Sequence, residues 1–281
     1  MTIKLAGLDG GAVDITPDML QSFKAAFRGP VLTSGDPEYE ASRKVWNAMI
    51  DRRPGLIARC TGTVDVVHAV RFASEHGILV SVRGGGHNIS DLAVCEGGLM
   101  IDMSHLRGVW VDPVQRTAHA QAGCTLGDVD RETQLHGLAA VLGFVSETGI
   151  AGLTLGGGFG YLTRRHGWAC DNVISMEVVT AAAEVVRVSK HENPECFGRC
   201  AAAAVILASS RRSNINCTQW ARKFSAASSP GAPTMPSRCW MPIANSVHRR
   251  HVNSPQLRSC KLRHRPRGCR EKSTASPLWL F

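Results

Sequence analysis

Residues 79–88 read LVSVRGGGHN, an apolar run that ends in an arginine, three glycines and a histidine. The apolar run predicts a strand. Three successive residues without a Cβ let the backbone turn sharply, so that successive N–H groups can face one concavity that suits a diphosphate, and Arg83 can add charge-assisted hydrogen bonds. A glycine triplet after a strand is also the usual composition of a tight turn. The triplet alone leaves both interpretations open.

The residues before this stretch predict a βαβ unit. An earlier apolar run, LIARC at 56–60, is followed by a helical pattern whose apolar residues are spaced by four and three, at Val66, Val70 and Ala73. Thr63 is the expected N-cap, and Gly77 suits the left-handed turn after the last helical residue. We expect a parallel strand pair joined by a crossover helix.

The residues after it predict further strands and one helix. Strands are expected at 99–103 and 108–110, and residues 109–123 read as a hairpin whose turn opens at Asp112-Pro113. Residues 126–136 are expected to be helical, and 172–180 and 184–188 to form a second strand pair, although Ala181 to Ala183 lack turn residues. The predicted fold class is α+β with mixed sheets.

Two common nucleotide-binding motifs are excluded. A P-loop requires Gly-Lys-Ser/Thr, which neither glycine-rich segment contains. A Rossmann fingerprint requires its glycines to open a helix, whereas NISDLAVCEGG at 88–98 is not helix-like.

The second glycine-rich segment, SETGIAGLTLGGGFGYL, spans 146–162. So many glycines suit a backbone that lies against a flat or charged ligand. A flexible loop is the alternative, but the interleaved residues Ile150, Leu153, Leu155 and Phe159 favour a packed segment.

Taken together, RGGGHN at 83–88, TGIAGLTLGGGFG at 148–160 and CDNVISMEVVTA at 170–181 resemble a known family. From about Phe27 to Cys196 the chain is similar to the PCMH-type FAD-binding domain of vanillyl-alcohol-oxidase-like or berberine-bridge-enzyme-like flavin oxidoreductases. The resemblance implies a small subdomain containing the βαβ unit and a second subdomain with a mixed sheet. We expect a helical lead-in at 1–34, the FAD-binding domain, incomplete at its C-terminus, at 35–196, and an irregular tail at 197–281.

The resemblance also implies roles for individual residues. Arg83, Gly84, Gly85 and Gly86 would hold the FAD pyrophosphate, and His87 matches the histidine that is joined covalently to the flavin 8α carbon. That bond withdraws electrons from the ring and fixes the cofactor, while the chemistry remains the flavin's. The other implied cofactor-binding residues are Asn88, Thr148, Gly149, Gly152, Gly156, Gly157 and the strand from Asn172 to Val178.

The cysteines do not predict a second flavin link or a metal site. Doubly linked relatives add a cysteinyl bond at a position that aligns with Val145, so one covalent link is expected. Cys124, in AGCTLGD, lies well upstream of that position. Cysteines 60, 95, 124, 170 and 196 show no C-x-x-C pair and no metal-ligand spacing, and we interpret them as free thiols.

The net charge of +9 is distributed unevenly along the 281 residues. Residues 1–196 carry 17 Lys+Arg and 22 Asp+Glu, a net charge of −5, and residues 197–281 carry 15 and 1, a net charge of +14; the two sum to +9. A strongly basic segment of this kind is typical of a nucleic-acid partner. In this chain the tail has another explanation.

After Cys196 the family pattern is WALRGGGGNFGIVTSFEYKLHPVGP, whereas the chain reads FGRCAAAAVILASSRRSNINCTQWAR. If the coding bases are read two positions later, allowed codons for residues 197–222 yield that family segment. Because the printed residues largely dictate the shifted codons, we infer a frameshift close to Cys196. The arginine excess then follows from out-of-frame reading, and the Pro, Ser and Arg-rich tail is expected to be disordered.

Two functional hypotheses follow. The first is an oxidoreductase, expected to be an oxidase, in which covalently bound FAD takes a hydride from a small organic alcohol or amine and passes electrons to an acceptor such as dioxygen. The second is a catalytically inactive flavin-binding fragment of a disrupted reading frame, because the substrate pocket and its catalytic base are not encoded. The sequence leaves the catalytic residues unknown, and no metal, nucleic-acid or membrane partner is expected. Since the N-terminus lacks a basic segment followed by an apolar stretch, the expected location is the cytoplasm.

Overall fold

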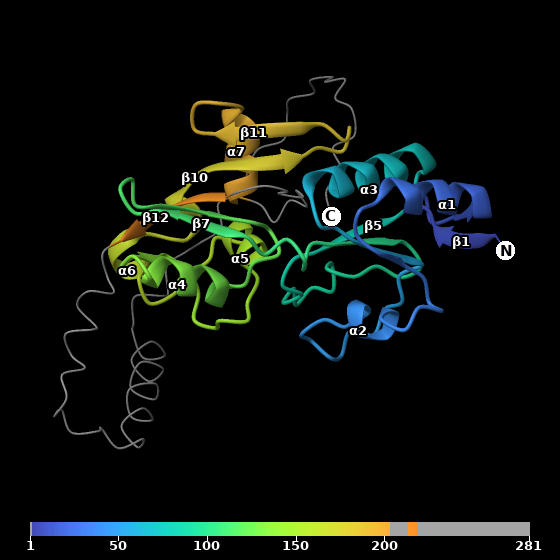
Figure 1. Ribbon diagram of the computed structural model, residues 1–281, viewed down its shortest axis with the longest axis horizontal. Helices are drawn as coiled ribbons and strands as arrows, with labels where there is room; N and C mark the ends of the chain where they lie inside the picture. Colours follow the sequence, from blue (N-terminus) through green and yellow to red (C-terminus); the bar gives the residue numbers. More distant parts are fainter. Residues whose placement is uncertain (1, 203–212, 219–281) are drawn as a thin grey trace, which may run out of the picture. The chain divides into compact units, whose positions relative to one another are not determined.

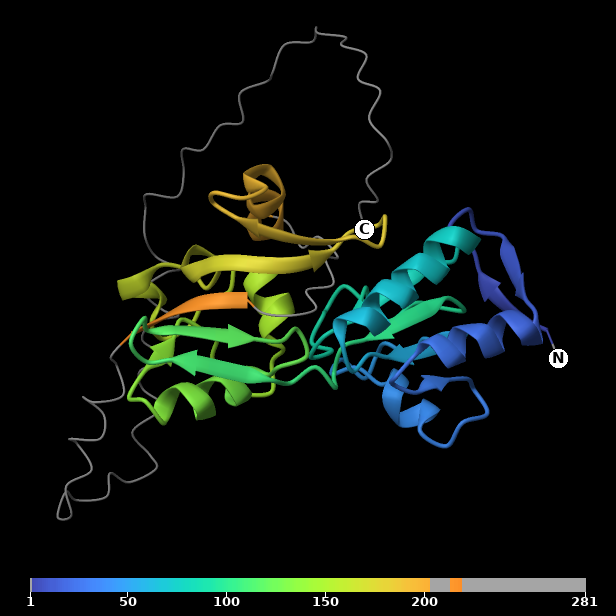
Figure 2. The same ribbon diagram turned by 45° about the horizontal axis from the view of Figure 1, so that its top comes forward.

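The computed structural model describes residues 2–202 and 213–218. These residues form an α+β fold, which confirms the predicted class (Figure 1, Figure 2). All of the described residues belong to one compact unit.

The first sheet has the strand order β3-β4-β6-β5. Its strands are β3 (Val31–Leu32), β4 (Leu56–Arg59), β5 (Val80–Arg83) and β6 (Leu99–Asp102). The crossover helix α3 (Thr63–His76) joins β4 to β5, as predicted. The two strands are parallel but not adjacent, because β6 lies between them and pairs with both in parallel. All four residues of β6 are buried, so burial of apolar surface places it in the centre.

Glycines cap both ends of helix α3. Gly77 adopts a left-handed conformation with φ 64°, as the sequence predicts. The expected N-cap, Thr63, is wrong: the cap is Gly62, and Thr63 is the first helical residue. Asp65, two residues later, reaches back instead and accepts hydrogen bonds from the Thr61 N–H (2.8 Å), the Thr61 hydroxyl (2.9 Å) and the Arg28 N–H (2.9 Å).

We expect Asp65→Ala to destabilise the fold by about 3 kcal/mol, since it leaves the Arg28 and Thr61 N–H groups without their acceptor. Burial by itself would raise the pKa of the Asp65 carboxyl. The hydrogen bonds from Arg28 and Thr61 lower the pKa by a larger amount, so it lies below its usual value. The stabilisation is therefore present at neutral pH and is lost as the pH falls through this lowered pKa. Urea unfolding at pH 7 and pH 3 measures both effects. The exposed Asp18→Ala, at the start of α1 (Pro17–Ala26), is the control, and equal stabilities of Asp65→Ala and wild type would contradict the prediction.

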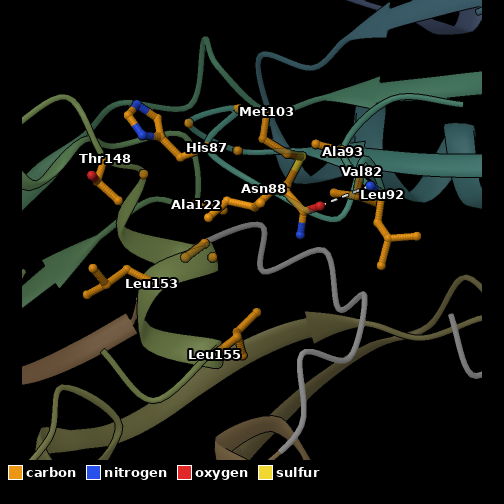
Figure 3. A pocket seen from close by; sticks show the side chains of 18 of the residues that line it. Val82, His87, Asn88, Leu92, Ala93, Met103, Ala122, Thr148, Leu153 and Leu155 are labelled. Atoms are coloured by element: carbon orange, nitrogen blue, oxygen red, sulfur yellow. Dashed lines mark hydrogen bonds between the residues drawn. The ribbon is translucent and has the colours of Figure 1, made fainter. Parts of the chain in front are cut away.

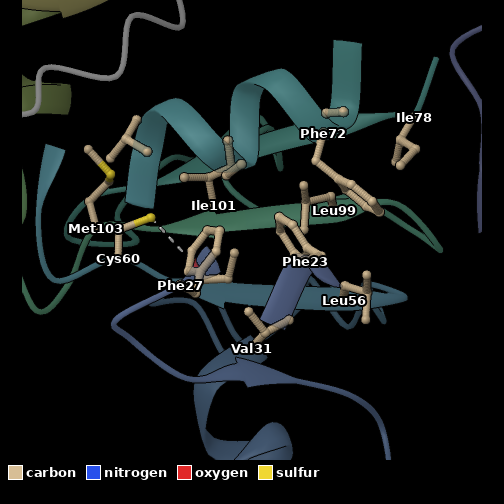
Figure 4. Packing of buried hydrophobic residues seen from close by; sticks show 14 of the residues in the cluster. Phe23, Phe27, Val31, Leu56, Cys60, Phe72, Ile78, Leu99, Ile101 and Met103 are labelled. Carbon is tan, nitrogen blue, oxygen red and sulfur yellow. Dashed lines mark hydrogen bonds between the residues drawn. The ribbon is translucent and has the colours of Figure 1, made fainter. Parts of the chain in front are cut away.

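The main core lies between the first sheet and helices α1 and α3 (Figure 4). Phe23 of α1 stacks on Phe72 of α3 with ring centroids 4.2 Å apart. A smaller cluster covers other residues of the same strands, among them Ile57 and Met100, together with Tyr39 of helix α2 (Tyr39–Arg43). The strands are thus buried on both faces, which explains their continuous apolar sequences.

The sequence predicts a helical lead-in for residues 1–34, but this segment contains strands as well as a helix. A hairpin of β1 (Ile3–Ala6) and β2 (Ala12–Ile15) precedes α1. Leu5 and Ile15 of this hairpin are fully buried in the main core. Its turn uses its own Asp9-Gly10 pair: Gly10 takes a left-handed φ of 83°, and the Gly11 N–H donates to the Asp9 carboxylate.

The second sheet contains both predicted hairpins. Strands β7 (Val109–Asp112) and β8 (Thr117–Ala120) are antiparallel, as are β10 (Val173–Val179) and β11 (Val185–Ser189). The alanine turn between β10 and β11 is possible because Ala183 takes a left-handed φ of 60°. The predicted helix is α4 (Leu126–Gln134), which a Thr125–Asp128 capping box starts. The remaining elements before residue 190 are β9 (Ala139–Ala140), α5 (Ile150–Leu155), α6 (Thr163–His166) and the 3-10 turn η1 (Cys170–Asn172).

The expected disorder from residue 197 is wrong for two segments. Helix α7 (Pro194–Ala202) runs through the first six residues of the tail, and strand β12 (Ser213–Thr218) pairs with β10, β8 and β9. A strand position between β10 and β8 can be filled by many sequences, because the ladder satisfies backbone N–H and C=O groups whatever the side chains. The other residues of the tail lie outside the described residues.

Candidate functional site

The two glycine-rich segments are in contact, although the elements from β6 to β9 separate them along the chain. A Cβ on Gly85 would lie 2.4 Å from both the N and the Cα atom of Gly149. A Cβ on Gly149 would lie 2.4 Å from the N atom of Gly85. Heavy atoms cannot approach that closely, so both positions require glycine if the two backbones are to stay in contact.

A cavity of about 640 Å³ lies beside this contact (Figure 3). The loop after β5 lines one side with His87 and Asn88, and α5 lines another with Leu153 and Leu155. The remaining lining residues are Val82, Gly84, Gly85, Gly86, Ile89, Ser90, Leu92, Ala93, Met103, Ala122, Thr148, Gly149, Ala151, Gly152 and Gly156.

The cavity suits an anionic group that backbone amides can bind. Within the described part of the chain, the N–H groups of residues 84–87 donate no hydrogen bond, and Gly86 is left-handed with φ 71°. The described lining includes no Asp, Glu, Lys or Arg, so an anion would meet amides and no carboxylate. A Cβ on Gly152 would meet nothing within 4 Å, so this glycine leaves room for a ligand in the cavity. These features fit a diphosphate beside a flat apolar group.

Most of the predicted site residues come together here. Nine of them line the cavity: Gly84, Gly85, Gly86, His87, Asn88, Thr148, Gly149, Gly152 and Gly156. Four are not among its lining residues: Arg83, Gly157, Asn172 and Val178. The two loops of the sequence prediction therefore form one site, and β10 contributes no described lining residue.

The four residues outside the lining have structural contacts of their own. The Arg83 guanidinium donates a hydrogen bond to the Ser42 carbonyl. The Asn172 side-chain amide donates to the carbonyls of His166 and Trp168, and Val178 is fully buried in a separate apolar cluster. Gly157 takes a φ of 96° and lies against the Trp168 ring. Arg83 thus bonds to the backbone of a neighbouring segment, and its role toward the diphosphate stays a prediction.

Sequence reasoning missed the apolar part of the lining and one aromatic neighbour. Val82, Leu92, Met103 and Ala122 line the cavity from four different segments, and local periodicity gives no signal for such a set. Trp46 stacks on the His87 ring, with centroids 5.3 Å apart and planes 19° from parallel. The nearest sequence signal was the VWNAMIDRRP segment at 45–54, which forms part of the family resemblance.

The cysteines in the described residues are free thiols, as expected: positions 60, 95, 124, 170, 196 and 200. Cys124 is fully buried, and its thiol lies 3.4 Å from the Gly108 carbonyl. Burial raises the pKa of this thiol to about 12. Cys124 is therefore unsuited to form a thioether with a cofactor, and the aligned position, Val145, has no thiol.

We expect Cys124 to resist alkylation by iodoacetamide at pH 8 in the folded protein, because burial raises the pKa of its thiol and keeps the reagent away from it. Peptide mass spectrometry measures the fraction of Cys124 that is alkylated when the reagent is added before and after unfolding in urea. Stoichiometric labelling of Cys124 in the folded state would contradict its burial. Cys170, which is only partly buried, is the internal comparison.

In the described ranges, no group of three or more His, Cys, Asp or Glu side chains could hold a metal ion. None of the described helices is both long enough and apolar enough to cross a membrane.

Comparison with known proteins identifies the domain. The FAD binding domain family matches residues 54–189. The (R)-6-hydroxynicotine oxidase of Paenarthrobacter nicotinovorans is 37% identical over 172 residues, which are 61% of this chain and 38% of that protein. The FAD-linked oxidoreductase pgmH of Aspergillus terreus is 37% identical over 192 residues, 67% of this chain and 39% of that protein.

Solved structures agree with these matches. The crystal structure of 6-hydroxy-D-nicotine oxidase from Arthrobacter nicotinovorans superimposes with a TM-score of 0.66 at 34% identity, over 68% of this chain and 42% of that chain. Glucooligosaccharide oxidase from Acremonium strictum, which carries a 6-S-cysteinyl, 8α-N1-histidyl FAD, gives a TM-score of 0.67 at 27% identity, over 71% and 42%.

The chain spans about two fifths of the length of these relatives. The matched part contains both glycine-rich loops and the cavity between them. Residues 54–189 therefore belong to the FAD-binding domain of the berberine-bridge-enzyme-like, PCMH-type flavin oxidoreductases, and FAD is the cofactor of that domain.

Proposed function

We propose that this chain binds FAD in the cavity between its two glycine-rich loops and holds it covalently through His87, as part of an FAD-linked oxidoreductase. The observation that carries the proposal is the position of His87, which lines the cavity directly after a loop whose N–H groups have no partner among the described residues. An imidazole next to an anion-binding loop is well placed to bond to the ring of a dinucleotide whose diphosphate that loop holds.

Each residue of the proposed site has a role that follows from its chemistry. The backbone N–H groups of Gly84, Gly85 and Gly86 hold the diphosphate, and the glycine contact between Gly85 and Gly149 keeps the two loops in register. Thr148 and Gly152 border the ligand on the α5 side. When bound, the flavin accepts a hydride from a substrate and passes the electrons to an acceptor.

Formation of the covalent link is a two-electron oxidation, and dioxygen is the proposed oxidant. A ring nitrogen of His87 forms a bond to the flavin 8α carbon, the imidazole gives up its N–H proton, and the 8α methyl gives up one hydrogen. Forming the link would therefore release two electrons and two protons in all, which dioxygen would take up to give hydrogen peroxide. His87 needs only to present a nitrogen at the right place, since the flavin supplies the redox chemistry.

The proposed substrates are small organic alcohols or amines, with dioxygen as the proposed acceptor. The relatives' names, a hydroxynicotine oxidase and a glucooligosaccharide oxidase, support both substrate classes. We further propose a cytoplasmic location. We propose that the catalytic base and the substrate contacts come from residues outside the matched range 54–189, so that turnover depends on those residues.

The alternative is a flavin-binding chain without turnover. It is favoured by the departure of residues 197–222 from the family pattern, which we attribute to a frameshift near Cys196. Resequencing the gene around that codon tests this directly, and a frame free of insertion or deletion relative to intact relatives would rule the frameshift out.

Acid precipitation of the purified full chain after incubation with FAD tests covalent binding. A yellow pellet that becomes fluorescent on proteolysis is the expected result. A colourless pellet, with all FAD in the supernatant, would overturn the covalent link. Amine and alcohol oxidation, followed by peroxide release, then separates the enzyme from the inactive flavoprotein.

A further inference from the structure

The segment after helix α2 lies against the glycine loop that carries His87. The Arg83 guanidinium donates to the Ser42 carbonyl, and the Trp46 N–H donates to the Gly86 carbonyl at 3.0 Å. The third contact is the stack of the Trp46 ring on the His87 ring. The glycine loop is therefore held at both ends of its turn by one short stretch of chain.

The stack matters because His87 has few other restraints. Gly86, the residue before it, has a left-handed φ of 71°, which places His87 at the end of a sharp turn. In the part of the chain that the structure describes, no hydrogen bond to the His87 ring is present. A histidine side chain has two rotatable bonds, so the Trp46 ring is the described contact that fixes the plane of the imidazole.

Trp46 contributes little to the core in its own right. Its side chain is 68% exposed, and it belongs to none of the described apolar clusters. An indole that leaves two thirds of its surface in water gains little from burial. The ring contact with His87 and the backbone bond to Gly86 are the interactions that its position does provide.

We propose that Trp46 is a positioning residue for flavin attachment: its indole holds the His87 imidazole in one orientation at the cavity that His87 lines. This inference rests on the proposed function, since it concerns the same covalent link. A fixed ring spends more time in the reactive orientation, so the rate of bond formation depends on the stack even though Trp46 touches no reacting atom.

The test compares variants of the full chain in a time course of covalent FAD incorporation, read as flavin fluorescence of the acid-denatured protein. Trp46→Ala is expected to slow incorporation roughly three- to tenfold, the population ratio that an aromatic stack supports. Trp46→Phe keeps a ring at the position and is expected to restore most of the rate. Trp110→Ala removes another partly exposed tryptophan, on β7, and is expected to leave the rate unchanged.

A measurement without FAD tests the stack itself. The ring protons of His87 are expected to show an upfield NMR shift in the wild type, from the ring current of the indole, and to lose it in Trp46→Ala. Urea unfolding of Trp46→Ala, expected to match the wild type closely, shows that the slower rate is not a loss of folding.

The outcomes separate this inference from the proposed function. If His87→Ala loses covalent flavin while Trp46→Ala incorporates it at the wild-type rate, the positioning role is wrong and the covalent link stands. If the wild type never forms a covalent adduct, or if His87→Ala still forms one, the proposed function fails and the role of Trp46 fails with it. An equal loss of rate in Trp46→Phe and Trp46→Ala also contradicts a ring-stacking role.

Discussion

Replacing His87 with alanine is expected to abolish covalent flavin completely, because the methyl group that remains has no nitrogen to bond to the 8α carbon. The glycine loop and its free N–H groups stay in place, so reversible FAD binding should persist in part. Acid precipitation after incubation with FAD should then give a colourless pellet and a yellow supernatant. The wild type should give the reverse.

A matched control is His136→Ala, which removes an exposed histidine just after α4 and away from the cavity lining. This variant should retain the yellow pellet in full. Peptide mapping of the wild-type adduct should place the flavin on the peptide that contains residues 83–88. A flavinylated peptide from elsewhere in the chain, or covalent flavin in His87→Ala, would refute the assignment.

The second large effect is expected for Gly149→Ala. The new Cβ would lie 2.4 Å from the N atom and 2.7 Å from the Cα atom of Gly85, and both of these are backbone atoms. Neither loop can yield by rotating a side chain, so the two segments must separate. We expect a loss of about 1–3 kcal/mol in the free energy of unfolding and a fall of roughly tenfold or more in FAD incorporation. Urea unfolding and the acid-precipitation assay measure the two effects.

Gly152→Ala is the informative comparison, because a Cβ there meets nothing within 4 Å. Gly152 lies inside α5, where alanine favours the helix by about 0.5–1 kcal/mol over glycine. This variant should therefore unfold no more easily than the wild type, while its methyl group takes up room in the cavity and weakens FAD binding. If Gly149→Ala were as stable as Gly152→Ala, the backbone contact between the two loops would be in error.

The first sheet and helix α3 show how much of the fold can be predicted from local sequence pattern. Helix α3 and strands β4 and β5 follow from apolar spacing and from the glycine at 77, and all three are present. The order of the strands does not follow, because β6 pairs with β4 and β5 through contacts distant in sequence. The start of α3 also differed, since Asp65 supplies a better acceptor than Thr63 by reaching back to Thr61.

Arg83 shows what residue type alone leaves open. An arginine beside three glycines suggests an anion-binding side chain, yet successive side chains of a strand point to opposite faces. Val82 lines the cavity, and Arg83, the next residue of β5, turns the other way to the Ser42 carbonyl. Alternation along the strand predicts that Val82 and Arg83 point to opposite faces of the sheet. Only the position of the cavity shows that Val82 is the one on the cavity side.

What the sequence by itself determined is the chemistry of the site: two glycine-rich segments able to bring bare amides to an anion, and a histidine directly after the first. The family motifs identified the cofactor. The tertiary structure alone decided that Gly85 touches Gly149, that Trp46 stacks on His87, and that the Arg83 and Asn172 side chains donate to backbone carbonyls. The reason is physical: backbone conformation and residue chemistry are local properties, whereas these contacts join segments that only the packing of two sheets and their helices brings together.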